Sequence, residues 1–454
     1  MPREADGESS SGEPRAIRTR MIHGASRTRR WDYNHHVVPP ISSSVTFRLD
    51  SAQRGARGFV DFGHLAPDGE PAGPIYIYDR LDEPTRGMLE ENLAVAERGE
   101  CAVCFATGMA AISAALGVLA QGGREIVAHQ TLYGCTYSLL SNWLPRFGVS
   151  TTYVDLTDAA ALGGAITPAT RVVYFETPVN PDMRLIDIAA VRRAVDGLNA
   201  SRAPGERIWI VVDNTFASPF CQRPLTLGAD VVVESLTKSI GGFGTDMGGV
   251  VVGPRCLYDA LVLYRKDFGG SLSPKAAWAT LVYGLPSLGA RMANYQKSAH
   301  HVARFLESHP RVAAVHYPGL TSFSQHALAR RQMVDEHGRF SPGGLLYFEL
   351  KHDGDDESAG ERLVDWIAQN AYCITLAVSL GQIKTLIECP YTMTHAALPP
   401  ERKAADGLTP GGIRLSVGLE DWHDLIADLR EALAATATRP TATGGRGRPF
   451  QPAP

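Results

Sequence analysis

A lysine that follows a buried strand and precedes a run of glycines is the first feature of the sequence able to carry chemistry. The apolar segment Asp230–Glu234 is expected to form the strand, and Ser235, Thr237 and Lys238 come directly after it. Open α/β sheets bind ligands at the carboxyl ends of their strands, and the two hydroxyls could donate hydrogen bonds to a phosphate. Glycines let the backbone approach a bound group closely, and they stand here at Gly241, Gly242, Gly244, Gly248 and Gly249. Because Lys238 precedes these glycines, the order G-x-x-x-x-G-K-S/T of a Walker nucleotide site is absent.

An aspartate ends a second apolar strand, Ile208–Asp213. A charge in that position is usually a ligand or a helix cap. Together, Asp213 and Lys238 suit pyridoxal phosphate (PLP). The lysine can bond covalently to the cofactor and then act as a base. The carboxylate can keep the pyridine nitrogen protonated, so that the ring takes up carbanion charge.

Two further segments could contribute to such a site. Gly108 and Met109 open an apolar helix, whose free backbone N–H groups could bind a phosphate. Tyr133 follows a predicted strand and could either stack on a flat ring or belong to the core. Neither segment is specific alone, because small residues at helix starts and buried tyrosines are common.

The elements that must position these residues alternate between short β-branched runs and longer amphipathic stretches. This pattern predicts a mainly parallel sheet with both faces covered. The predicted strands are Ile126–His129, Thr151–Asp155, Arg171–Phe175, Ile208–Asp213, Asp230–Glu234 and Gly249–Val252. The predicted helices include Thr85–Arg98, Met109–Leu119, Tyr133–Phe147 and Ile186–Leu198. From about Ser287, longer helices with fewer strands, such as Leu345–Leu350, indicate a smaller α+β domain.

Composition narrows the class of protein. With 454 residues, the chain should form two or three packed units. A net charge of -4 gives no basic footprint for nucleic acid, and the basic segment Arg15–Arg30 is interpreted as a surface or subunit arm. The uncharged stretch Ala102–Ala120 could mimic a membrane span. Because it is broken near its start by Thr107-Gly108 and dominated by Ala and Gly, it is predicted to be a buried helix instead. Because Met1–Gly12 lacks the features of a signal peptide, we expect a cytoplasmic location and no membrane partner.

The seven cysteines have no framework spacing, and their odd number indicates a reducing compartment. Cys101 and Cys104 form a C-x-x-C without a second pair, within an apolar run. We therefore expect them to be buried and structural, and we expect no metal site.

Taken together, these segments resemble the cystathionine γ-synthase/methionine γ-lyase family of Cys/Met-metabolism PLP enzymes. The resemblance runs from about Thr19 to Ala435. Its motifs occur in the family's order, as Tyr78-Asp79-Arg80, Gly108-Met109, Tyr133, Asn180-Pro181, Asp213, Ser235-Leu236-Thr237-Lys238, Ser379-Leu380-Gly381 and Arg414-Leu415-Ser416-Val417-Gly418.

The resemblance implies the α/β fold of type I PLP-dependent transferases, which is like that of aspartate aminotransferase. A mostly parallel seven-stranded sheet would form the large domain, and a smaller α+β domain would follow it. The implied divisions are a disordered tail over 1–18, an arm contacting the neighbouring subunit over 19–82, a PLP-binding domain over 83–286, a C-terminal domain over 287–436 and a disordered tail over 437–454. Such enzymes are usually homotetramers, built as dimers of dimers whose active sites are shared across each dimer.

The resemblance also assigns roles to individual residues. Lys238 should hold the cofactor, Asp213 should pair with its ring nitrogen, and Asn180 should lie near its phenolic oxygen. Tyr133 should stack on the ring and serve as an acid. The phosphate should be cradled by Gly108, Met109, Ser235 and Thr237, with Tyr78 and Arg80 reaching it from the neighbouring subunit. Ser379 and Arg414 should bind the substrate carboxylate, and Cys135 should lie near the substrate's sulfur.

Finer features favour methionine γ-lyase chemistry, which is α,γ-elimination of methionine to 2-oxobutanoate, ammonia and a thiol. Thr131–Thr136, Lys266-Asp267, Leu376–Gly381 and Thr392–His395 are similar to segments of that enzyme. Cys135 could instead be a packing residue, and Lys266-Asp267 a solvated surface pair.

Several positions depart from the family pattern. Glu234 and Phe243 stand where histidines are frequent, Glu83 replaces an asparagine, and Gln382–Lys384 is unusual beside the serine. The length of Gly241–Thr245 is closer to that of O-acetylhomoserine sulfhydrylases. These departures leave γ-replacement (O-acetylhomoserine sulfhydrylase or cystathionine γ-synthase) and cystathionine γ-lyase activity as alternatives.

Two interpretations from other classes are less well supported. A non-catalytic regulator that binds a phosphate ligand would not need Lys238, Asp213 and Tyr133 together. An aminotransferase shares the lysine and the aspartate, but Tyr133–Cys135 and the Tyr78/Arg80 pair favour the lyase branch.

Overall fold

The computed structural model describes residues 15–24, 36–60, 76–351, 358–396, 401, 403 and 407–437. The tails predicted to be disordered, 1–18 and 437–454, lie almost wholly outside these residues. Helix α1 (Ile17–His23) nevertheless begins inside the first of them.

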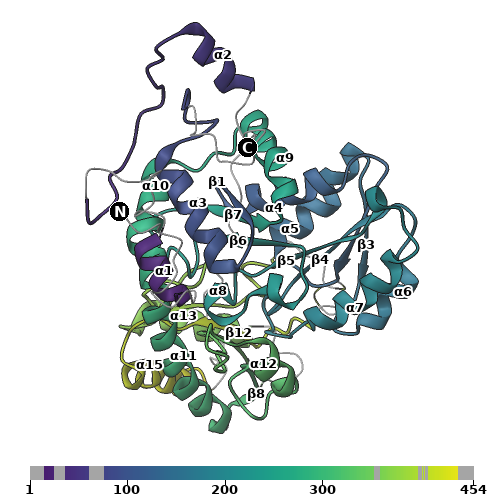
Figure 1. Ribbon diagram of the computed structural model, residues 1–454. Helices are drawn as coiled ribbons and strands as arrows, with labels where there is room; N and C mark the ends of the chain where they lie inside the picture. Colours follow the sequence, from purple (N-terminus) through teal and green to yellow (C-terminus); the bar gives the residue numbers. More distant parts are fainter. Residues whose placement is uncertain are drawn as a thin grey trace, which may run out of the picture.

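A seven-stranded sheet forms the centre of the large unit (Figure 1). Its order is β1-β7-β6-β5-β4-β2-β3. Neighbouring strands pair in parallel, except that β7 runs antiparallel to both β1 and β6. The predicted mostly parallel sheet is thus confirmed. The strands are β1 (Cys101–Phe105), β2 (Glu125–His129), β3 (Ser150–Val154), β4 (Thr170–Glu176), β5 (Trp209–Asp213), β6 (Val231–Ser235) and β7 (Gly249–Gly253).

In the stretch Ala102–Ala120, the buried helix is found beyond the predicted break at Thr107-Gly108, and the residues before the break do not belong to it. The run begins with β1, which pairs with β7, and only its second part forms α4 (Gly108–Leu119). Thr107 separates the two elements, because its side chain accepts a hydrogen bond from the Ala110 N–H and caps the helix. The residues before the break are a short apolar run that is buried throughout, so hydrophobicity alone does not identify them as a strand.

The C-x-x-C pair lies on β1, and both cysteines are buried. Side chains at i and i+3 of a strand point to opposite faces, so Cys101 and Cys104 do not face each other. Burial raises the pKa of the Cys101 thiol to about 11. Both thiols therefore stay protonated near neutral pH.

Helices cover both faces of the sheet. Successive side chains of β6 point to opposite faces, and they are buried on both. Val232 packs with α3 (Pro84–Glu97) and α10 (Pro274–Ala279) on one face. Val231 and Val233 pack with α4 and α9 (Tyr258–Phe268) on the other. Further along the sheet, α7 (Ile188–Asn199) packs on β4 and β5. Shorter helices are α2 (Ala52–Val60), α6 (Leu162–Ala165), α8 (Ser218–Cys221) and α12 (His326–Gln332).

The helix predicted over Tyr133–Phe147 is helical but irregular. It begins as α5 (Gly134–Ser138), passes through a π-helical turn (Leu139–Trp143) and ends in a 3-10 turn (Leu144–Phe147). Pro145, which has no N–H to donate, accounts for the tightened end.

A second sheet of five strands follows, in the order β10-β11-β12-β9-β8. The sequence predicted one of these strands and missed four. Two of the four have only two or three residues and show no periodicity. The strands are β8 (Val312–His316), β9 (Leu345–Leu350), β10 (Thr375–Leu376), β11 (Leu386–Glu388) and β12 (Gly412–Ser416), and they pack against α13 (Ala359–Asn370) and α15 (Trp422–Ala435).

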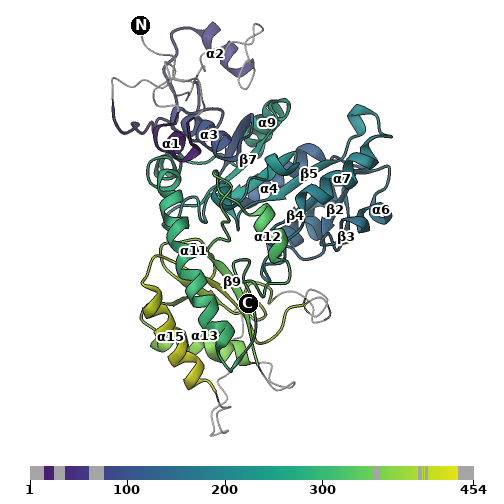
Figure 2. The same cartoon turned by 60° about the horizontal axis from the view of Figure 1, so that its bottom comes forward.

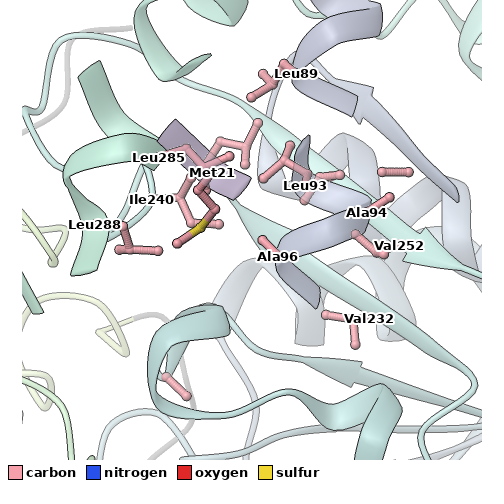
Figure 3. Packing of buried hydrophobic residues seen from close by; sticks show 14 of the residues in the cluster. Met21, Leu89, Leu93, Ala94, Ala96, Val232, Ile240, Val252, Leu285 and Leu288 are labelled. Atoms are coloured by element: carbon pink, nitrogen blue, oxygen red, sulfur yellow. The ribbon is translucent and has the colours of Figure 1, made fainter. Parts of the chain in front are cut away.

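The long helix α11 (Leu285–Ser308) runs from one unit into the other (Figure 2). Its first turns place Leu285 and Leu288 in the core of the large unit, where Met21 of α1 and Leu93 of α3 also lie (Figure 3). Its later turns contribute to the core behind the second sheet, through Ala299, Val302, Ala303 and Leu306. Within the described segments, no helix combines the length and hydropathy needed to cross a membrane.

Candidate active site

Lys238 lies in the turn after β6, between the two sheets. Its Nζ donates to the hydroxyl of Ser379 over 2.7 Å. Burial, followed by the charge of Arg414, lowers the pKa of Lys238 to about 8, and Glu388 opposes this shift. About a tenth of the amine is therefore unprotonated at pH 7, far more than for an ordinary lysine, and the unprotonated amine is the form that acts as a nucleophile and a base.

The loop carrying Lys238 is fixed by residues from later in the chain. The Arg291 guanidinium of α11 donates to the carbonyls of Ser239 and Ile240 over 2.6 and 3.1 Å. Gly381 lies so close to this loop that a Cβ there would come within 2.5 Å of the Ser239 nitrogen. Beside it, Ser379 has a φ of 89°, which is uncommon for a residue with a side chain.

Asp213 ends β5, next to β6 in the sheet. Its carboxylate accepts hydrogen bonds from the Thr215 N–H at 2.9 Å and the Tyr174 hydroxyl at 3.4 Å. Neither donor is charged, and burial raises the pKa of Asp213. A cationic partner would therefore stabilise the carboxylate in this position.

The amino terminus of α4 approaches the end of β6. A Cβ at Gly108 would lie 2.9 Å from the Cβ of Ser235, so the close approach requires glycine. Nearby, Gly248 N–H donates to the Thr237 hydroxyl over 3.1 Å. Met109 follows in α4 and accepts a weak contact from the Thr136 hydroxyl at 3.9 Å.

Arg414, on β12, joins the second sheet to the site. Its guanidinium donates to the Asn180 side-chain oxygen at 2.9 Å and to the Ser379 carbonyl at 3.1 Å. It also forms a buried ion pair with Glu388 at 3.1 Å. The sequence analysis did not identify Glu388. Only the strand register, which places Glu388 opposite Arg414, could have indicated it.

Tyr133 directly precedes α5 and is 39% exposed. Its N–H donates to Glu176 Oε1 over 2.7 Å, and Glu176 lies opposite Asp213 in the sheet. Burial, followed by a contact with Cys135, raises the pKa of the Tyr133 hydroxyl, which therefore keeps its proton. Glu176 is a second residue that the sequence analysis missed.

The segment Tyr133–Cys135 meets the second unit. A Cβ at Gly134 would lie 3.3 Å from the carbonyl oxygen of Thr394, so two of the segments similar to methionine γ-lyase are in contact. Cys135 itself is exposed.

Tyr78 and Arg80 make their contacts at the carboxyl end of α9. Arg80 donates to the Lys266 carbonyl over 2.7 Å, and its guanidinium lies 5.6 Å from the Tyr78 ring. Lys266 and Asp267 form an ion pair at 3.2 Å. The structure thus joins Tyr78 and Arg80 near the Lys266-Asp267 pair. Contacts link Lys238 through Ser379 to Arg414 and Asn180, and Gly108 lies against Ser235.

Three of the departures from the family pattern have local structural roles. Glu83 caps α3 by accepting from the N–H groups of Thr85 and Arg86. Phe243 packs against Arg291, with 5.6 Å between guanidinium and ring. Gln382 packs against Gly244, where a Cβ would lie 2.5 Å from its amide oxygen.

These residues fit pyridoxal phosphate. Lys238 offers an amine with a lowered pKa, and Asp213 is a half-buried carboxylate whose hydrogen-bond donors are uncharged. Gly108 leaves backbone N–H groups at the start of a twelve-residue helix open to a phosphate. The amine, the carboxylate and the helix start correspond to the cofactor's aldehyde, ring nitrogen and phosphate.

Comparison with known proteins gives the same assignment. A family model described as Cys/Met metabolism PLP-dependent enzyme matches residues 18–434. The chain is 41% identical to an L-methionine gamma-lyase of Pseudomonas putida, covering 92% of this chain and 97% of that protein. It is 39% identical to an O-succinylhomoserine sulfhydrylase of Mycobacterium tuberculosis, covering 79% and 84%. A crystal structure of cystathionine gamma-lyase from Lactobacillus plantarum, complexed with L-serine, superposes with a TM-score of 0.80 at 32% identity, covering 93% and 100%.

Proposed function

The chain belongs to the Cys/Met metabolism PLP-dependent enzyme family, and we propose that it cleaves the carbon–sulfur bond of methionine or a close relative by α,γ-elimination. The products would be 2-oxobutanoate, ammonia and a thiol. The contact of Tyr133–Cys135 with the Thr394 segment carries this proposal, because it joins two segments that are similar to methionine γ-lyases. The 41% identity to the Pseudomonas putida enzyme supports it.

We assign the cofactor to the residues around Lys238. Lys238 would hold it covalently, Asp213 would pair with the ring nitrogen, and Asn180 would lie near the phenolic oxygen. Tyr133 would stack on the ring. The phosphate would be bound by Gly108, Met109, Ser235 and Thr237. When bound, pyridoxal phosphate supplies a ring that stabilises negative charge on the substrate's α-carbon.

The protein's own groups would perform the remaining steps. The planar guanidinium of Arg414, together with Ser379, would bind the substrate carboxylate. The Lys238 amine would remove the α-proton, for which a pKa of about 8 suits it. The Tyr133 hydroxyl would donate a proton to the departing sulfur. Its raised pKa keeps that proton available across the neutral range.

Cys135 is expected to act on the sulfur end of the longer substrate. Cys135→Gly should slow γ-elimination from methionine more than β-elimination from cysteine, because only methionine's side chain extends to that thiol. Pocket contacts of this size discriminate by about 1–3 kcal/mol, or roughly tenfold to two hundredfold. The kcat/KM values for both substrates measure this. Equal losses on both substrates would mean that Cys135 only fills space, and Cys256→Gly, at another exposed cysteine, is the matched control.

γ-Replacement is the second candidate function. The length of Gly241–Thr245 and the 39% identity to an O-succinylhomoserine sulfhydrylase favour it. Product analysis with methionine, cystathionine, cysteine and O-acetylhomoserine separates the activities. Negligible turnover of methionine beside fast sulfide-dependent consumption of O-acetylhomoserine would overturn the lyase proposal.

We further propose a homotetramer, built from two dimers with shared active sites, in the cytoplasm. In this assembly residues 19–82 form the arm, 83–286 the PLP-binding domain and 287–436 the C-terminal domain. In the single chain, apolar side chains of the arm are exposed, which a neighbouring subunit would cover. They are Val37, Val38, Ile41, Val45, Leu49, Phe59 and Val60.

Hybrid dimers are expected to regain activity. If Tyr78 and Arg80 serve the neighbouring subunit's phosphate, a mixture of Lys238→Ala and Arg80→Ala proteins should contain dimers with one intact site. Activity should rise towards about a quarter of the wild-type value, since half of the dimers are hybrids with one good site in two. Activity assays after confirmed subunit exchange test this. A mixture of Lys238→Ala and Asp213→Asn, two changes within one subunit's part of the site, should show no rescue, and an equal absence of rescue in the Arg80→Ala mixture would contradict shared sites.

A further inference from the structure

Two glutamate side chains, Glu97 at the end of α3 and Glu234 in β6, are buried side by side behind the site. Glu97 is 0% exposed and Glu234 is 2% exposed. The side-chain amide nitrogen of Asn214 donates to Oε1 of Glu97 at 2.7 Å and to Oε1 of Glu234 at 3.2 Å. Because one nitrogen reaches both, the two carboxyl groups are immediate neighbours.

The second oxygen of each carboxyl group has no donor. Oε2 of Glu97 and Oε2 of Glu234 are both buried without a hydrogen-bond partner. Arg223, the cation whose charge acts on Glu97, directs its donors instead to the carbonyls of Pro219, Val334 and Asp335. Two ionised carboxylates in this position would repel each other. A proton shared between the two carboxyl groups removes this repulsion.

The pair holds the segments that carry the cofactor residues. Asn214 directly follows Asp213, and its backbone N–H donates to the Val233 carbonyl at 3.0 Å. The next residue, Thr215, donates its N–H to Asp213 and accepts from the Ser235 N–H, both at 2.9 Å. The glutamate pair reaches this turn, which lies between the ends of β5 and β6, through the side chain of Asn214.

We propose that Glu97 and Glu234 hold one proton between them and act as a positioning pair, which fixes Asn214 and thereby keeps the Asp213 carboxylate in place for the cofactor's ring nitrogen. One of the two carboxyl groups is protonated, and its O–H donates a hydrogen bond to the other, ionised carboxylate. This inference rests on the proposed role of Asp213.

The surroundings of the pair favour the protonated form. Burial raises the pKa of Glu97 to about 7, although Arg223 opposes the shift. Burial raises the pKa of Glu234 further, and the charges of Glu97 and Asp213 add to it. For a folded-state pKa above the unfolded value, stability falls as pH rises through the folded pKa. The contribution of the pair to the stability of the folded protein should therefore decrease as the pH rises from about 4.5 through about 7 and above.

The shared proton can be observed directly. Infrared difference spectra of the wild type against Glu234→Gln and against Glu97→Gln should each show loss of a protonated-carboxyl carbonyl stretch at neutral pH. The exposed Glu431→Gln should show no loss. A wild-type spectrum without such a band overturns the proposal, and this result does not depend on the role of Asp213.

The positioning role is tested by cofactor affinity. Glu234→Gln supplies an amide N–H in place of the proton, so it should bind pyridoxal phosphate as tightly as the wild type does at pH 6. Wild-type affinity should fall as the pH rises to about 9 and the affinity of Glu234→Gln should not. Glu234→Ala should bind about tenfold more weakly at both pH values, as for a lost hydrogen bond to a charged group.

Unchanged affinity in Glu234→Ala, or equal pH dependence in the wild type and Glu234→Gln, overturns the positioning role. If Glu234→Ala does not fold, the pH comparison between the wild type and Glu234→Gln decides alone. If the infrared band is lost as expected but affinity is unchanged, the shared proton stands and the proposed link to Asp213 fails.

Discussion

Replacement of Lys238 by alanine should abolish covalent attachment of the cofactor and reduce turnover by at least about 10²–10⁴-fold, which is the typical contribution of a positioned acid or base. Two losses combine, because the same amine would hold the cofactor and remove the α-proton. The purified wild type should show a visible absorption band that borohydride bleaches, with hydride reduction fixing the cofactor on the peptide containing Lys238. The variant should show neither the band nor the labelled peptide.

The matched control is Lys297→Ala, which removes an exposed lysine from α11. It should retain the band, the reducible bond and the activity. A Lys238→Ala protein that kept both the band and a reducible adduct would show that another lysine holds the cofactor.

Asp213→Asn should lower kcat by about 10²–10³-fold, the usual loss when one group that stabilises developing charge is removed. Asparagine keeps the shape of the side chain but not the charge that holds the ring nitrogen protonated. In the cofactor-free protein, by contrast, the same substitution should increase the stability of the fold. The Asp213 carboxylate is half-buried and desolvation raises its pKa, so a neutral side chain relieves this desolvation.

The measurements are kcat, the absorption spectrum of the bound cofactor, and melting temperatures with and without it. The cofactor should raise the melting temperature of the variant less than that of the wild type. Asp196→Asn, at an exposed position of α7, should change none of these values. An Asp213→Asn enzyme with normal kcat would remove Asp213 from the proposed mechanism.

The large sheet could be predicted from the sequence because its strands are continuous apolar runs bounded by turns. Six of its strands were found in this way to within one or two residues at each end. β1 was missed because its five residues form a short apolar run without alternation, which a strand and a buried helix share. Most of the second sheet was missed because β10 and β11 are very short, and their pairing depends on distant partners rather than on local pattern.

The site residues differ in the same way, because some are marked by the local sequence and others only by contacts in the folded chain. Lys238 and Asp213 could be found because each stands at the carboxyl end of a predicted strand, where a charge is unexpected. Glu176 and Glu388 could not, because their importance lies in contacts with Tyr133 and Arg414 that only the folded chain creates. Likewise, Glu234 is a departure from a motif in the sequence, and only its contact with Asn214 and its position beside Glu97 give it a proposed role.

The continuity of α11 couples the two sheets thermodynamically. A division of the chain between residues 286 and 287 falls within the first turn of this helix. The amino-terminal fragment would then lack Leu288 and Met292 in its core, and the other fragment would expose them to water. Neither half is therefore a self-sufficient folding unit. Arg291 of the same helix also donates to the loop that carries Lys238. A substitution that loosens either core would therefore affect the position of the reactive amine through this helix.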